Sequence, residues 1–500
     1  MSEKRLFFPL LFALLLAARM CHTGILWEGD AFPLAAAGQM LAGKAIYRGI
    51  WFDKPPLLAL FYLPIGARPG WALRLEGALY ALLCCWIVYR FGRDLWSRRE
   101  GLWAGGLLGF YLVFYVPSAV IPVASDLLML APHAAAVWMA FRRRPFWSGA
   151  LAAVALWISP KGVFVAAACA LWYPAGIPLM AAGWAAVSGA AAAWLWSCGS
   201  LAPYWREVWQ WGLLYAGTPL AEPVKNGLLR TFHWMGFHAA ACVAAAWFLA
   251  KGFSADDGST PSKAEQESVG RRKRQPHPPA SPSATRWGRR FRLPVVPFAG
   301  WVIVSAAGVA AGMRFFPRYY FLLLPAVVLM AARGFTLLGH GRAFVAALLL
   351  IPLARFGPTY ATALTGAVWR DTEMDRDSRA AAALIREASR PGDTLFVWGY
   401  RPEIYVYARL SAASMFLDSQ PLTGVPADRY LTQSAPVEQE EDPRKNRAEL
   451  AGTRPTIVAI TAVAAGNPRL DIAQYPDLRA WFAQYRQVAR THNTVIYRRQ

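Results

Sequence analysis

The stretch Val163–Trp196, VFVAAACALWYPAGIPLMAAGWAAVSGAAAAWLW, contains no charged residue. Similar apolar runs occur at Leu6–Met20, Ala78–Val88 and Ala239–Ala250. A helix of roughly 20 apolar residues crosses a bilayer core that is about 30 Å thick. Trp and Tyr gather near the ends of these runs, at the depth that amphipathic rings prefer. Only 16% of the chain is charged, against about 25% in soluble proteins. The sequence therefore predicts a polytopic α-helical membrane protein.

The chain has a net charge of +22, and its basic residues lie mostly in short loops between the apolar runs. Cytoplasmic loops of membrane proteins are enriched in Lys and Arg, so topology explains most of this charge. No RNA- or DNA-binding motif accompanies it. We therefore expect membrane lipid, and no nucleic acid, among the partners.

The apolar runs predict about eleven transmembrane helices. They cover about residues 6–26, 71–90, 101–117, 126–141, 145–158, 162–176, a seventh ending near Cys198, 232–250, 294–312, 319–333 and 343–357. Lys4 and Arg5 predict a cytoplasmic N-terminus, and every strongly basic loop then falls on that side. Met1–Ala18 is also similar to a signal peptide, but the many later spans favour an uncleaved first helix. Residues 27–70 form a long first outer loop. Residues 251–292, basic and Ser/Pro-rich, are expected to be a disordered cytoplasmic loop.

An odd number of spans places residues 369–500 outside the cytoplasm, as a small α/β domain after a transmembrane domain of residues 1–368. Leu395–Trp398 and Thr456–Ile460 have strand patterns, and Ser378–Ser389 and Asp477–Tyr485 have helical ones. None of the six cysteines lies in this tail, so no disulfide framework is indicated. The tail has no Gly-rich phosphate loop, nucleophile elbow or metal-ligand cluster.

Ionisable residues at the outer ends of spans are the candidate functional residues, since a charge at membrane depth is costly. They are Glu28, Asp30, Asp53, Lys54, Asp126, Lys161, Arg314 and Arg318. Each also has an ordinary structural explanation. Asp30 would be a solvated loop carboxylate, and Asp126 an acid at a helix N-terminus. Asp53 and Lys54 would form a local ion pair at a helix start. Interface anchoring would explain the two arginines, although they and Lys161 run against the positive-inside bias.

Several short motifs contain these charges. They are Glu28-Gly29-Asp30, Trp51-Phe52-Asp53-Lys54-Pro55-Pro56-Leu57, Leu73-Arg74-Leu75, Asp126, Lys161-Gly162, Arg314 through Tyr320, and in the tail 392–399 and Pro402-Glu403-Ile404-Tyr405. Together they resemble the lipid-linked-sugar glycosyltransferases of the GT-C superfamily. The resemblance is to the bacterial branch of the protein O-mannosyltransferase family, which includes the lipid A aminoarabinose transferase. That family has a Phe-Glu-Lys-Pro-Pro element where this chain has Asp53 in place of Glu.

The resemblance implies a glycosyltransferase that takes a sugar from a polyprenyl phosphate donor, with Asp30 as the first-loop catalytic carboxylate. A sugar hydroxyl needs a carboxylate base to attack an anomeric carbon, and a phosphate leaving group needs positive charge. Asp126 would orient the acceptor or share the base role. Lys54, Lys161, Arg314 and Arg318 would bind the donor phosphate, with Glu28, Asp53 and Tyr319 in supporting roles. No metal ligand is identified, although a divalent cation is left open. Single displacement implies inversion at the anomeric carbon.

Two other functions stay open from the sequence. A transporter or flippase of a lipid-linked saccharide would also need many spans, but its charges are expected at the bilayer centre. A membrane scaffold whose outer domain binds glycans is the third reading. For the transferase, the acceptor is a glycan, a lipid or a protein, and the expected location is the inner (plasma) membrane of a bacterium with the C-terminal domain in the periplasm.

Overall fold

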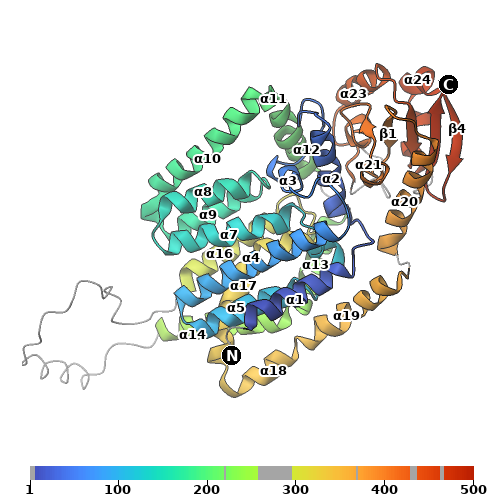
Figure 1. Ribbon diagram of the computed structural model, residues 1–500. Coiled ribbons are helices and arrows are strands. Elements are labelled where there is room, and N and C mark those ends of the chain that lie inside the picture. The colour runs from blue at the N-terminus through green and yellow to red at the C-terminus, as the bar shows by residue number, and fades with distance from the viewer. Residues whose placement is uncertain (1–5, 219–220, 257–294, 368–369, 428–435, 462–466) are drawn as a thin grey trace, which may run out of the picture.

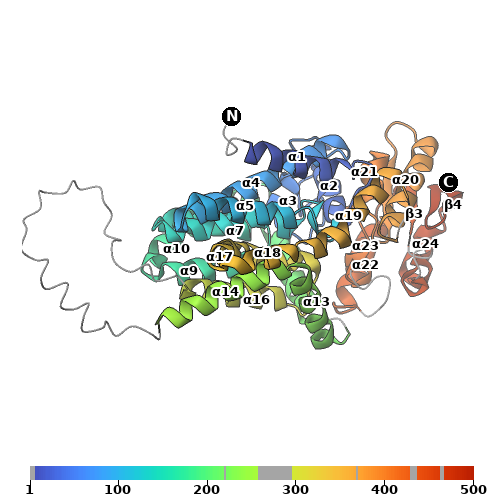
Figure 2. The ribbon, with the colours of Figure 1, turned by 90° about the horizontal axis from the view of Figure 1, so that it is seen from below.

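A computed structural model describes residues 6–218, 221–256, 295–367, 370–427, 436–461 and 467–500. The chain forms a large helical part, and a smaller part with a β-sheet lies at one end of it (Figures 1 and 2). The predicted cytoplasmic loop, 251–292, lies mostly outside the described residues. The predicted domain boundary, 368/369, also lies outside them.

The main helices of the helical part lie mostly where the apolar runs predict spans. They are α1 (Phe7–Met20), α4 (Trp71–Leu95), α5 (Arg98–Tyr111), α7 (Ser125–Phe141), α8 (Pro145–Leu156), α9 (Gly162–Trp172), α10 (Ile177–Ser197), α13 (Pro223–Phe237), α14 (Ala239–Asp256), α16 (Val295–Ala310), α17 (Leu324–Leu337), α18 (Arg342–Ala347) and α19 (Leu350–Thr365). Small residues let their backbones approach closely. A Cβ atom at Gly334 of α17 would lie 1.9 Å from the carbonyl oxygen of Ala244 in α14, so only glycine fits there.

Three helical stretches of the described chain are long and apolar enough to cross a membrane: Trp71–Leu95, Pro174–Ser197 and Gly339–Thr365. A fourth crossing is obtained if α13 and α14 count as one, but they meet at an angle of 90°. The predicted straight span over 232–250 is therefore wrong, because the helix breaks at His238. The described chain also contains several shorter apolar helices. The fold and its apolar helices fit a multi-pass membrane protein, but the count of about eleven spans is not confirmed.

The first outer loop is more ordered than its Pro- and Gly-rich sequence indicates. It contains α2 (Glu28–Leu41) and the short α3 (Leu57–Leu60). The acidic residues Glu28 and Asp30 lie in the first turn of α2, where the helix dipole favours negative charge. Other short elements of the helical part are α6 (Pro117–Val120), η2 (Pro174–Gly176), α11 (Leu201–Tyr204), η3 (Trp205–Gln210), α12 (Trp211–Gly217), η4 (Pro317–Leu322) and η5 (Gly339–Gly341).

The C-terminal part is built on a five-stranded sheet with the order β2-β1-β3-β5-β4. Its strands are β1 (Thr394–Trp398), β2 (Ser411–Ala412), β3 (Ile457–Ile460), β4 (Tyr485–Arg490) and β5 (Val495–Arg499). Its helices are α20 (Arg370–Ala388), α21 (Glu403–Ala408), α22 (Gln420–Thr423), α23 (Glu441–Ala451), η7 (Pro468–Leu470), η8 (Ile472–Gln474), η9 (Pro476–Leu478) and α24 (Arg479–Phe482). β1 pairs in parallel with β2 and β3, whereas β5 pairs antiparallel with β3 and β4.

The predicted strands over 395–398 and 456–460 and the helix over 378–389 are confirmed. The helix predicted over 477–485 is wrong beyond Phe482. Tyr485 begins β4, which pairs with β5 as a terminal hairpin. The helical spacing of residues 477–485 gives no sign of this pairing, because the pairing depends on residues that follow the segment.

Hydrogen bonds from the first loop hold the C-terminal part in place. The side chain of Gln39 donates to the carbonyl oxygen of Leu410 (3.2 Å) and accepts from the backbone N–H of Ala412 (2.7 Å). The backbone N–H of Trp51 donates to the carbonyl oxygen of Met415 (2.8 Å). The first loop and α2 therefore lie between the helical bundle and the sheet (Figure 1).

Candidate functional site

Asp126 is the centre of a group of charges drawn from three elements. It lies in the first turn of α7, and its Oδ1 accepts a hydrogen bond of 2.8 Å from Nζ of Lys161, which precedes α9. Nε of Arg318, in η4, lies 3.7 Å from the other carboxylate oxygen. The Lys161 ammonium also lies 2.8 Å from the centre of the Tyr319 ring. Residues far apart in the sequence thus place two cations on one buried carboxylate.

Asp53 and Lys54 of the first loop form a second ion pair, with an N–O distance of 2.6 Å. The Lys54 side chain is 39% exposed, so its ammonium can reach a bound anion. The pKa of Lys161 is lowered to about 8, mainly by burial and also by the positive charges of Arg318 and Lys54, which together outweigh the opposite effect of Asp126. The two ion pairs therefore influence each other.

Glu28 is the exposed carboxylate of this group, and among the described residues it has no ion-pair partner. Burial lowers the pKa of the Arg318 guanidinium. The nearby Glu28, Tyr319 and Asp126 outweigh this effect, so the pKa is raised above its ordinary value. The start of α2 therefore faces η4. We call these residues the charged cluster: Glu28, Asp53, Lys54, Asp126, Lys161, Arg318 and Tyr319.

Asp30 lies only two residues from Glu28 but is fully buried and held by three donors. NH1 of Arg74 donates to one carboxylate oxygen (2.8 Å). The Tyr62 hydroxyl (2.8 Å) and the backbone N–H of Val123 (3.0 Å) donate to the other. Arg74, itself buried, also donates to two backbone carbonyls. The structure thus places Asp30 in an internal ion pair and not on an open surface.

The close packing around Asp30 depends on Gly29. A Cβ atom at this position would lie 3.0 Å from side-chain atoms of both Pro122 and Ala124. Such contacts are tighter than ordinary van der Waals contact, so the turn fits best without a side chain. Gly29 therefore lets α2 come close enough for Asp30 to accept a hydrogen bond from the backbone N–H of Val123.

Arg314 lies outside the charged cluster, although it was expected to bind the donor phosphate. Its guanidinium is buried, donates to the carbonyl oxygens of Tyr215 (2.8 Å) and Thr218 (3.1 Å), and stacks 3.6 Å from the centre of the Tyr215 ring. These contacts tie the C-terminal end of α12 to the segment before η4. Its observed contacts are those of a structural cross-link.

Three further residues near the cluster were not singled out from the sequence. Glu207 of η3 accepts from the backbone N–H of Phe52 (2.8 Å) and so positions the segment that carries Asp53 and Lys54. Tyr400 and Asp418 come from the C-terminal part. Burial, together with the nearby charge of Asp53, raises the pKa of Asp418 to about 7. Tyr400 follows the carboxyl end of parallel strand β1, a position that often lines ligand sites and was the available signal.

The described residues bring together no group of three or more His, Cys, Asp or Glu side chains that fits a metal ion. Both carboxylate oxygens of Asp126 already have cationic partners. A divalent cation there would have to displace Lys161 or Arg318, so the arrangement does not fit one.

The fold, a helical part that carries a smaller part with a β-sheet, has similar folds among solved membrane-enzyme structures. It is similar over nearly its whole length to ArnT from Cupriavidus metallidurans. The apo structure of ArnT aligns with a TM-score of 0.57 and 13% identity over 99% of this chain and 98% of that one. The structure of ArnT bound to undecaprenyl phosphate aligns with a TM-score of 0.56 and 13% identity over 98% and 97% of the two chains. At this identity the likeness concerns the fold alone.

A weaker similarity links the chain to an oligosaccharyltransferase from Archaeoglobus fulgidus, crystallised with Zn and sulfate. Its TM-score is 0.48, with 17% identity over 99% of this chain and 73% of that one. This value is too low to support an argument. No protein-family model matches the chain, and no curated protein matches it in sequence.

Proposed function

We propose that this protein is a membrane glycosyltransferase that moves a sugar from a polyprenyl phosphate to an acceptor on the outer face of the membrane. The observation that carries the proposal is the charged cluster, in which three cations lie close together and the exposed carboxylate of Glu28 lies near one of them, Arg318. The GT-C fold, and the undecaprenyl phosphate bound by ArnT, agree with a lipid-phosphate donor. In this proposal residues 1–368 form the transmembrane catalytic domain, and residues 369–500 form the domain on the outer face.

The reaction needs one bond made and one bond broken. An acceptor oxygen forms a bond to the anomeric carbon, and the bond from that carbon to the phosphate oxygen breaks with its electron pair staying on the phosphate. The acceptor proton passes to a carboxylate. Attack opposite the leaving group inverts the anomeric carbon. Lys54, Lys161 and Arg318 supply the positive charge that stabilises the departing phosphate.

Glu28 is our candidate for the base, in place of the expected Asp30. A base must come within hydrogen-bond reach of the proton that it takes. Asp30 is enclosed by its three donors, and Asp126 is neutralised by two cations. Glu28 is exposed and close enough to Arg318 to affect its pKa. Asp30 then acts as a positioning residue that fixes the first turn of α2.

Transfer of labelled sugar from a polyprenyl phosphate to a membrane extract tests the proposal. We expect transfer by the purified full chain, and a loss of about tenfold to a hundredfold in Arg318→Gln, because two other cations remain. Arg469→Gln, an exposed arginine of the C-terminal part, is the matched control and should keep the wild-type rate. If the wild type moves the lipid-linked sugar across a vesicle bilayer without transferring it, the transporter alternative is correct.

The transfer rate is expected to fall as the pH rises through about 8. Lys161 is charged below its pKa of about 8 and loses its charge above it, so the phosphate loses one of its cations. Lys161→Arg should move this decline to higher pH, since a guanidinium stays protonated. The measurement is the rate between pH 6 and 10 for both proteins. An identical high-pH decline in both would assign it to another group.

A further inference from the structure

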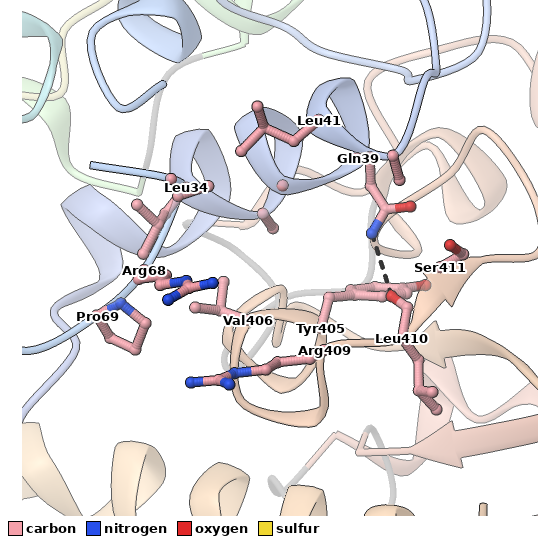
Figure 3. A pocket seen from close by; sticks show the side chains of 15 residues that line it. Leu34, Gln39, Leu41, Arg68, Pro69, Tyr405, Val406, Arg409, Leu410 and Ser411 are labelled. Carbon is pink, nitrogen blue, oxygen red and sulfur yellow. Dashed lines mark hydrogen bonds between the residues drawn. The ribbon is translucent and has the colours of Figure 1, made fainter. Parts of the chain in front are cut away.

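A pocket of about 310 Å³ lies between the first outer loop and the C-terminal part, away from the charged cluster (Figure 3). One wall comes from the second half of α2 and from residues 66–69, and the other from α21 and the residues that follow it. The hydrogen bond from Gln39 to the Leu410 carbonyl closes one side (Figure 3). Counted along α2 at 1.5 Å per residue, Gly38 at the pocket lies about 15 Å from Glu28.

Two arginines line this pocket, one from each wall. Figure 3 shows Arg68 entering from the first-loop side and Arg409 from the C-terminal side. Both side chains are exposed, and among the described residues neither forms a hydrogen bond or an ion pair through its guanidinium. Two cations that face one pocket without a carboxylate favour an anionic ligand. A phosphate group suits them because guanidinium groups bind it through paired hydrogen bonds.

The backbone at Arg409 also sets this residue apart. It ends α21 in the left-handed conformation, with φ of 58°, where glycine is the usual residue. An arginine costs backbone energy there and projects a guanidinium into the pocket. The backbone at the end of α21 favours glycine, so it does not explain why an arginine stands at position 409.

Apart from Gln39 and Ser411, the rest of the pocket lining is largely apolar. Leu34, Leu41, Val406 and Leu410 line the pocket. Three residues after Arg68, the exposed Trp71 begins α4, one of the three helices able to cross a membrane. A second hollow runs from there along α4 over Leu75, Leu79 and Leu83 and, apart from Glu76 and the Tyr80 hydroxyl, is lined by apolar groups. Trp favours the membrane interface, so with α4 across a membrane the two arginines would lie at headgroup level, next to this apolar hollow.

We infer that this pocket binds the phosphate headgroup of an anionic membrane lipid, with the acyl chains lying along α4. The two arginines belong to different parts of the chain, so a lipid held by both bridges the first loop and the C-terminal part. A ligand that binds only the folded protein raises its stability by linkage. The bound lipid therefore strengthens the attachment of the C-terminal part to the membrane part.

The test uses the purified full chain in a neutral detergent, with short-chain phosphatidylglycerol as the anionic lipid probe. Phosphatidylcholine of the same chain length is the neutral comparison. We expect phosphatidylglycerol to bind and to raise the melting temperature. Arg68→Gln and Arg409→Gly should each weaken binding by at least about tenfold, the effect of losing one charge-assisted hydrogen bond. Glycine suits the backbone at position 409, so the second variant should fold at least as well as the wild type.

Two further variants separate pocket binding from general charge effects. The pair Arg454→Gln and Arg469→Gln removes two charges from exposed positions outside the pocket and should leave binding unchanged. Ala42→Trp changes no charge but fills the pocket from an exposed position and should reduce binding as the arginine variants do. Wild-type affinity in both arginine variants would overturn the site. Equal binding of phosphatidylcholine, or of inorganic phosphate, would overturn the anionic lipid as its occupant.

Discussion

Replacing Glu28 with Gln is expected to lower sugar transfer by about a hundredfold to ten-thousandfold, the usual contribution of a general base. The amide keeps the size of the side chain but cannot accept the acceptor proton. Glu28 is exposed and has no ion pair among the described residues, so the substitution should leave the melting temperature within about a degree or two. The measurements are the transfer rate at saturating donor and the thermal unfolding of the same preparation.

Glu387→Gln is the matched control, since Glu387 is an exposed helical glutamate of α20 in the C-terminal part. It should transfer sugar at the wild-type rate. If Glu28→Gln keeps more than about a tenth of that rate, Glu28 is not the base. Asp126 would then be the next candidate, provided that its two cations move away when the donor binds.

Replacing Asp30 with Ala should destabilise the protein by about 3–5 kcal/mol, because the buried guanidinium of Arg74 loses its charge partner. The Tyr62 hydroxyl and the Val123 N–H lose their acceptor as well. We expect low yield and a melting temperature well below that of the wild type. A loss of transfer in this variant reflects loss of folded protein, so the rate must be divided by the folded fraction.

A double-mutant cycle with Arg74→Met identifies the ion pair as the cause. Each single variant leaves one charge buried and unpaired, whereas the double variant removes both. The double variant should therefore be more stable than the sum of the single effects indicates, by about 1–3 kcal/mol. Additive effects would contradict a structural ion pair. Normal stability in Asp30→Ala with no transfer would restore the catalytic role that the sequence indicated.

The sequence by itself determined where most helices and several strands lie. Apolar runs such as Val163–Trp196 become helices because their backbone hydrogen bonds are all local. The strand patterns near residues 395 and 457 were also sufficient. The broken helix at His238 and the hairpin that begins at Tyr485 were not predictable, because each depends on segments that a local pattern does not contain.

The sequence also indicated which charges belong to the candidate site, but only the tertiary structure decided what each one does. Glu28 and Asp30 are two residues apart, so on a helix they point about 200° from each other, to opposite faces. Packing of α2 against Val123 and Arg74 buries one carboxylate and leaves the other open. Likewise, Asp418 comes close to Asp53, and Arg409 faces Arg68 across the pocket, only when the C-terminal part docks on the first loop. A linear pattern carries the chemistry of a side chain, whereas its partners and its exposure come from segments that lie tens to hundreds of residues away.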